Sequence, residues 1–154
     1  MSIFGQLDAK AIPASPYYIA QGEYSAEVTK AEYRIRKETQ ERQLFLEFTI
    51  DDEESLFHNK KAAKFFDLVD PELTNEKLMM LPASEQATTH KNLATLKRAL
   101  CGFNNVKGLG VDPDDLNDEN WSPATLQGLK VIITVTNWGP DNQNVNVKYA
   151  NLVE

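Results

Sequence analysis

Alternation of apolar and polar side chains marks two strands in the first third of the chain. Residues 23–35 alternate between apolar side chains, such as Tyr24 and Ala26, and polar neighbours. Successive side chains of a strand point to opposite faces, so this period of two predicts a half-buried strand. The run 43–51 alternates more strictly, with one apolar stripe made of Leu44, Leu46, Phe48 and Ile50. It predicts a second strand, joined to the first by a charged hairpin tip at residues 34–42.

The middle of the chain changes from a strand to a helix. Residues 60–70 (KKAAKFFDLVD) predict a third strand that ends near Pro71, because proline cannot donate to a strand ladder. Residues 71–89 predict a loop with a short helical turn. In residues 90–102 leucines recur at helical spacing, which predicts an amphipathic helix with Leu93, Leu96 and Leu100 on one face.

Residues at both ends of this helix predict its limits. Thr88 or Thr89 is the expected N-cap, because a side-chain oxygen there accepts a hydrogen bond from a free backbone N–H. Gly102 is expected to end the helix, since glycine adopts the left-handed backbone conformation common at helix ends. Residues 104–128 are rich in Gly, Asp, Asn and Pro and predict a long surface connection.

Two further alternating runs close the chain. Residues 129–138 (LKVIITVTNW) and 145–153 (VNVKYANLV) each predict a strand. The segment NWGPDNQN between them has the residue types of a tight turn.

The predicted order is therefore strand, strand, strand, helix, strand, strand. This is the order of the OB fold, a five-stranded barrel with one helix between its third and fourth strands, and an all-β barrel of this type is the expected fold. A β-sandwich is the rival, but a single central helix suits it less well. We expect an N-terminal arm at residues 1–21, where alternation is absent, and the OB-type domain at residues 22–154.

The net charge of −7 argues against nucleic acid as a partner until its distribution is considered. Residues 30–64 carry eight basic and eight acidic side chains, but four of the acids form the single run Asp51 to Glu54. Without that run the segment has a charge of +4, so one face of an acidic molecule could be basic. The alternative is that these charges simply coat a solvated surface.

The side chains needed for catalysis are few. The chain has two histidines, His58 and His90, in different predicted elements, and a single cysteine, Cys101, which is expected to pack on the helix. The acidic residues at 112–115 lack the spacing of a calcium loop. We therefore expect no enzyme, no cofactor and no metal site. One cysteine and no apparent secretory signal or long apolar run also predict a cytoplasmic protein without a membrane segment.

The residues suited to binding single strands are more plentiful. Such proteins combine a positive groove with aromatic rings on which bases stack. In an OB barrel the site lies on strands two and three, between the strand 1–2 and strand 4–5 loops. The residues expected there are Arg34, Arg36, Lys37 and Arg42 on the first loop, Phe45 on strand two, Lys60, Lys61, Lys64 and Phe66 on strand three, and Trp138 on the last loop.

Each of these residues has a simpler interpretation. Phe45 could cover the outside of the barrel, and the lysines of strand three could be charges that discourage edge-to-edge pairing. Of the neighbours Phe65 and Phe66, alternation places one in the core without saying which. Trp138 could fold back on its own loop.

The same residues carry a family resemblance. The segments IPASPYYIAQGEYSAEVTKAEY, QLFLEFTID, LATLKRALCGFN, LQGLKVIITVTNW and NVNVKYANLV resemble those of small bacteriophage OB-fold single-stranded DNA-binding proteins, over roughly residues 13–153. In place of the glycine common in that family's first hairpin, this chain has KETQER. The resemblance implies coating of single-stranded DNA during phage replication, recombination or repair in the infected bacterial cell.

The expected partners follow from this function. They are single-stranded DNA and phage or host replication and recombination proteins, with self-association as an option. The alternative function is a non-enzymatic protein-interaction or virion-assembly module on the same barrel, which the net charge of −7 favours.

Overall fold

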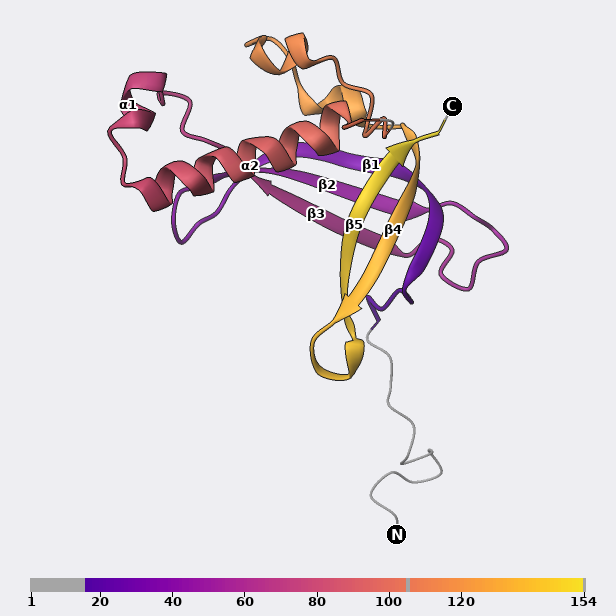
Figure 1. The fold of residues 1–154 in the computed structure, drawn as a ribbon. Coiled ribbons are helices and arrows are strands. Elements are labelled where there is room, and N and C mark those ends of the chain that lie inside the picture. The colour runs from indigo at the N-terminus through magenta and orange to yellow at the C-terminus, as the bar shows by residue number, and fades with distance from the viewer. Residues whose placement is uncertain (1–15, 105, 154) are drawn as a thin grey trace.

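The computed structural model describes residues 16–104 and 106–153 (Figure 1). Three strands come first, helical segments follow, and two further strands close the chain. In chain order the elements are β1 (Gly22–Ile35), β2 (Arg42–Ile50), β3 (Lys61–Asp67), α1 (Asn75–Met79), α2 (Ala83–Cys101), the 3-10 turns η1 (Pro113–Asn117) and η2 (Pro123–Leu126), β4 (Lys130–Trp138), the 3-10 turn η3 (Pro140–Asn142) and β5 (Asn144–Leu152).

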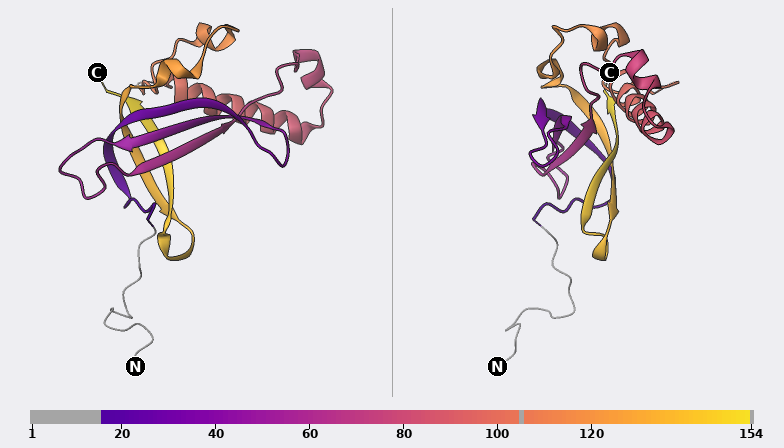
Figure 2. Two further views of the ribbon diagram at one scale, coloured as in Figure 1. Left: turned by 180° about the vertical axis from the view of Figure 1, so that it is seen from behind. Right: turned by 90° about the vertical axis from the view of Figure 1, so that its left-hand side faces the viewer.

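All neighbouring strands are antiparallel, and their order in the sheet is β3-β2-β1-β4-β5. The 14-residue strand β1 belongs to both halves of the sheet, since Ala26 pairs with Ile50 on one side and with Val131 on the other. A bulge between Val28 and Lys30 interrupts its ladder with β2, and bulges increase the local twist of a strand. Figures 1 and 2 show β4 and β5 crossing over the β1–β3 half, so that the sheet wraps around a core.

The prediction of a mostly β fold with one main helix is confirmed, but the hydrogen bonds do not close a barrel. In the part of the chain that the structure describes, β3 and β5 are the two edges of an open sheet, with no ladder between them. Both edges run in the same direction, because an even number of antiparallel steps separates them. We call the gap between these two edges the seam.

The core lies inside the wrapped sheet. Each strand contributes the side chains of one face, and the fully buried ones include Val28, Leu46, Phe48, Ile133 and Val147. The C-terminal half of α2 adds Leu100 to this cluster, while its other end and α1 extend away from the sheet (Figure 1). The predicted arm at residues 1–21 lies largely outside the described residues. Of the part described, Ile19 is fully buried in the core.

The helix α2 begins earlier than the sequence predicted. Its N-cap is Pro82, so Thr88 and Thr89 lie inside it, and the prediction that one of them caps it is wrong. Their hydroxyls instead donate to the carbonyls of Ser84 and Glu85, at 3.0 and 2.9 Å. This bond to the preceding turn is the usual way for threonine to satisfy its hydroxyl within a helix.

The predicted end of α2 is confirmed. Its C-cap is Gly102, which has a φ of 91° and donates its N–H to the Arg98 carbonyl. No helix within the described ranges is long and apolar enough to cross a membrane.

Candidate nucleic-acid interface

Two faces of the β1–β3 half of the sheet differ in character. One packs on the core through Leu44, Leu46 and Phe48. We call the opposite surface the outer face; it carries Arg34 of β1, Phe45 and Glu47 of β2, and Lys61 and Phe65 of β3.

Three side chains of the outer face stack on one another. The register pairs Phe45 with Phe65, and their ring centroids lie 5.0 Å apart with the planes tilted by 46°. On the other side of Phe45, the Arg34 guanidinium carbon lies 3.5 Å from the ring centroid. Phe45 is thereby only 5% exposed, whereas Phe65 remains 51% exposed. Phe65 is therefore the ring that this stack offers to a ligand.

The choice of Phe66 as a stacking residue is wrong. Phe66 pairs with Leu44 and shares the core face with it, where it is 5% exposed. Alternation along β3 places Lys64 on this face as well, away from the outer face where it was predicted. Its Nζ donates to the carbonyl of Val147 on β5 at 2.6 Å, and burial lowers its pKa. Lys64 thus bridges the seam instead of facing the outer surface.

Two cations of the outer face, Arg34 and Lys61, are paired with carboxylates. Arg34 lies 2.7 Å from Glu32, and Lys61 Nζ lies 3.3 Å from Glu47 Oε1. Partial burial alone would raise the pKa of Glu47, but hydrogen bonds from Thr29 and Lys61 outweigh it and lower that pKa. A phosphate approaching this face therefore competes with internal ion pairs.

Cations of the β1–β2 hairpin occupy different surroundings. Arg36 lies 4.0 Å from Glu41 within the turn, and Lys37 is exposed there. Arg42 is directed to the tyrosine of the same hairpin, with its guanidinium carbon 5.5 Å from the Tyr33 ring centroid. Arg42 shares its face with Leu44 and lines the groove beside α2, so the prediction that it belongs to the single-strand-binding face is wrong. In the described residues, no cation–ring contact joins Arg36 or Lys37 to Phe45 or Phe65.

Two other predicted residues lie apart from the stack. Lys60 precedes β3, and its Nζ donates to the Pro16 carbonyl at 2.6 Å. Trp138 is the last residue of β4 and is 59% exposed. Figure 1 shows its β4–β5 hairpin projecting downward, away from the β1–β2 turn on the left. One strand of DNA would have to cross the sheet to touch both hairpins.

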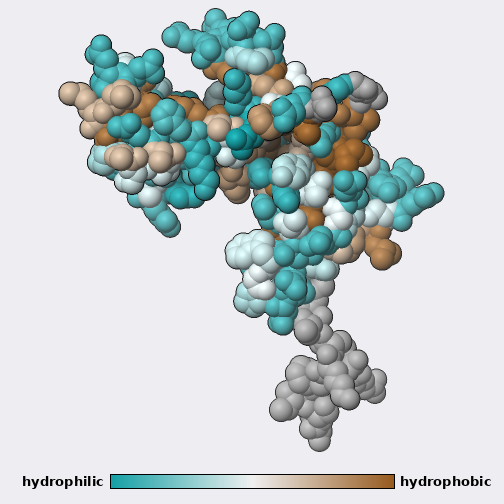
Figure 3. Space-filling model, viewed as in Figure 1, coloured by the Kyte–Doolittle hydropathy of each residue, from teal (hydrophilic) through white to brown (hydrophobic). Residues whose placement is uncertain are grey.

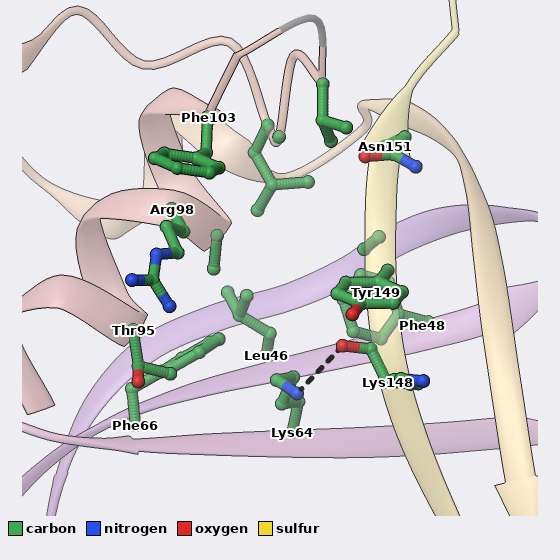
Figure 4. A pocket seen from close by; sticks show the side chains of 15 residues that line it. Leu46, Phe48, Lys64, Phe66, Thr95, Arg98, Phe103, Lys148, Tyr149 and Asn151 are labelled. Carbon is green, nitrogen blue, oxygen red and sulfur yellow. Dashed lines mark hydrogen bonds between the residues drawn. The ribbon is translucent and has the colours of Figure 1, made fainter. Parts of the chain in front are cut away.

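Sequence reasoning missed a second group of cations and rings at the seam. Arg98 and Phe103 near the end of α2 and Tyr149 of β5 line a cavity there with Lys64 and Phe66 (Figure 4). Tyr149 resembled an ordinary wall residue, and Arg98 an ordinary outward charge of a helix. No signal in the sequence connects these residues, because their exposure and their proximity follow from the fold.

Among the described residues, no cluster of three or more His, Cys, Asp or Glu side chains could hold a metal ion. Cys101 packs against the core, and burial raises the pKa of its thiol. A raised pKa keeps a thiol protonated and weakly nucleophilic at neutral pH.

Comparison with known proteins identifies no family for this chain. No protein-family model matches the chain, and a search of curated proteins finds no similar sequence.

Proposed function

We propose that this protein is a non-enzymatic single-stranded DNA-binding protein without sequence preference, built on an OB-type barrel that is open at one seam. The observation that carries the proposal is the stack of Arg34, Phe45 and Phe65, which ends in a half-exposed ring. Aromatic rings next to cations bind any base, because every base has a face on which to stack.

The strand arrangement supports the OB-type assignment. OB folds are partly open five-stranded barrels whose ligands lie on strands two and three, and the stack occupies those two strands. The parallel edges β3 and β5 lie close enough for Lys64 to bridge them. The position of the stack on strands two and three and the nearness of the two edge strands both favour an OB-type fold over a flat sheet.

The biological setting is part of the same proposal. The chain would coat single-stranded DNA during phage replication, recombination or repair in the cytoplasm of an infected bacterium. Replication or recombination proteins of phage or host would be its further partners.

Titration with a dT oligomer at two salt concentrations tests the proposal. Binding should quench tryptophan fluorescence, with the exposed Trp138 as the reporter, and weaken as salt rises, because phosphate contacts release counterions. Absence of quenching at low salt, together with no shift of the oligomer in a gel, would contradict the proposal.

Substitution of the exposed ring tests the site itself. Phe65→Ala should weaken dT binding by about 1–3 kcal/mol, the usual contribution of one stacked base. Leu56→Ala is the matched control, since Leu56 is 94% exposed on the β2–β3 turn and lies off the outer face. Equal loss in both variants would show that Phe65 has no specific role.

A protein-interaction or virion-assembly module is the second candidate, favoured by an apolar groove. The groove lies between the end of the β1–β2 hairpin and α2, and its walls include Tyr33, Leu68, Leu93, Leu96 and Trp121. Light scattering and a pull-down distinguish the two functions. A defined complex that forms equally with and without DNA, and that Leu93→Asp disrupts, would favour this alternative.

A further inference from the structure

The seam holds a cavity, whereas the outer face is an open surface. It has a volume of about 500 Å³, within the range of pockets that hold small ligands. Figure 4 shows Thr95, Arg98 and Phe103 on one side, Tyr149 and Asn151 of β5 on the other, and Lys64 at its base. Figure 3, in the view of Figure 1, shows apolar surface in brown to the upper right of centre, between hydrophilic projections.

The walls of the cavity carry positive charge without negative charge. Its cationic residues are Lys64, Arg98 and Lys148, and none of its lining residues in the described ranges is acidic. The chain as a whole has 23 acidic and 16 basic residues, so an acid-free lining goes against its composition. Such a lining favours an anionic ligand.

Within the described residues, no carboxylate lies at ion-pair distance from the cations of the cavity. Across residues 16–104 and 106–153, no ion pair involves Lys64 or Arg98, whereas Arg34 and Lys61 of the outer face are both paired. The Nζ of Lys64 donates to the carbonyls of Val147 at 2.6 Å and Lys148 at 3.5 Å, and it lies 5.5 Å from the Phe66 ring centroid. An incoming phosphate would meet these charges without displacing an internal carboxylate.

Two exposed rings stand at the rim of the cavity. Phe103 is 56% exposed and Tyr149 is 55% exposed. Each has a cation beside it, Arg98 at 5.2 Å from the Phe103 centroid and Lys148 at 5.3 Å from that of Tyr149. Rings with neighbouring cations are suited to stacking a base beside its phosphate.

One wall atom lacks a partner. Asn151 Oδ1 is buried and accepts no hydrogen bond, and it is the one such side-chain atom found in the described residues. A buried acceptor without a donor is costly, so an incoming N–H group would be stabilised there. Each of the four DNA bases carries an N–H donor.

We propose that the seam cavity binds one nucleotide of a DNA single strand, with the base on Tyr149 or Phe103 and the phosphate at Arg98. This inference rests on the proposed function and extends the interface beyond strands two and three to the β3–β5 seam and α2. The described lining holds no acidic residue that would repel the phosphate. Asn151 Oδ1 can accept a hydrogen bond from an N–H of the base, and the two rings supply the stacking surface.

Photocrosslinking of the unmodified protein tests the proposal. A dT oligomer carrying 5-iododeoxyuridine is irradiated with the protein, and crosslinked peptides are mapped by mass spectrometry. Crosslinks at Tyr149 or Phe103 are expected. Crosslinks confined to Phe65 or Trp138 would overturn the seam site and leave the proposed function intact.

Matched variants supply a second measurement. Arg98→Ala and Tyr149→Ala should each weaken dT binding about tenfold, the order expected for a lost stacking or phosphate contact. Lys91→Ala on α2 and Asn146→Ala on β5 are the controls, since both residues lie outside the cavity lining. Unfolding midpoints in urea confirm that each variant is folded.

The outcomes separate the two proposals. If Phe65→Ala weakens binding while Arg98→Ala and Tyr149→Ala bind like the controls, the seam site is wrong and the outer face remains. If the wild-type protein binds no dT at low salt, the proposed function fails and the seam site fails with it. Weakening by Arg98→Ala and Tyr149→Ala but not by their controls supports the seam site.

Discussion

The outer face and the seam cavity both bring cations close to aromatic rings, but they compensate those cations differently. On the outer face, Glu32 and Glu47 pair with Arg34 and Lys61. At the seam, Lys64 is held by backbone carbonyls, and no described carboxylate pairs with it. The Arg34–Glu32 pair is exposed, and such pairs contribute only about 0–1 kcal/mol, so a phosphate could replace this carboxylate at small cost. At the seam, a phosphate would displace no described carboxylate from Lys64 or Arg98.

The comparison shows why net charge is a poor guide to partners in this chain. The charge of −7 is an average over surfaces that differ in sign and in pairing. What a phosphate encounters is the local arrangement within about one Debye length, roughly 8 Å at physiological salt.

The largest expected effect comes from removing one ring from each region. If one DNA strand contacts both, the double variant Phe65→Ala with Tyr149→Ala should lose about 2–6 kcal/mol of binding free energy, the sum of two stacking losses. The measurement is the dT titration for the wild type, both single variants and the double variant. A double variant no weaker than the worse single variant would mean that the strand uses one region only.

Stability distinguishes two lysines of β3 on opposite faces. Lys64→Met removes the donor that bridges the seam and should cost about 1–2 kcal/mol, because a hydrogen bond from a charged group is lost. Lys61→Met removes a partly exposed ion pair with Glu47, which keeps the hydrogen bond from Thr29, and should change the free energy of unfolding by less than about 1 kcal/mol. Urea unfolding of both variants measures the difference. Equal losses would mean that the seam contact contributes no more than a surface ion pair.

Acid should weaken the outer face before the seam. The pKa of Glu47 is lowered below its ordinary value of 4.5, so its contribution to stability is complete above about pH 4.5. That contribution is lost as the pH falls through the lower pKa of the folded state. Glu47→Gln should therefore lose less stability than the wild type between pH 7 and pH 3.

Urea unfolding at both pH values, with Glu53→Gln as control, checks the acid effect. Glu53 lies on the exposed β2–β3 turn, away from the ion pairs of the outer face. An identical pH response of Glu47→Gln and the wild type would contradict the role given to Glu47.

Most of the strands could be predicted because alternation is a local property. The run 43–51 shows its buried stripe directly, and the glycine at 102 ends α2 where expected. The N-terminus of α2 could not be predicted in the same way. Thr88 and Thr89 have the composition of caps, but within a helix their hydroxyls find carbonyls one turn earlier. A threonine can either cap a helix or lie inside one, and in this chain α2 continues through both threonines.

The candidate site was predicted in part for a related reason. Phe45 was placed correctly on the outer face because its strand has an unambiguous stripe. Phe65 and Phe66 are adjacent and equally apolar, so their assignment depended on which of them pairs across from Leu44. Arg98 and Phe103 lie at the end of α2 and Tyr149 lies on β5, and no local pattern connects these two places.

The sequence by itself determined the mostly β architecture, the position of the main helix and one face of each strand, because these depend on periodicities within short segments. Tertiary structure alone decided the state of the seam, the inward position of Lys64 and the assembly of the acid-free cavity. Those features arise where β3, β5 and α2 meet, and contacts between distant segments depend on how the whole sheet bends. The bend of the sheet decides whether a charged side chain such as Lys64 is buried and what it pairs with, and no single segment of the sequence determines that bend.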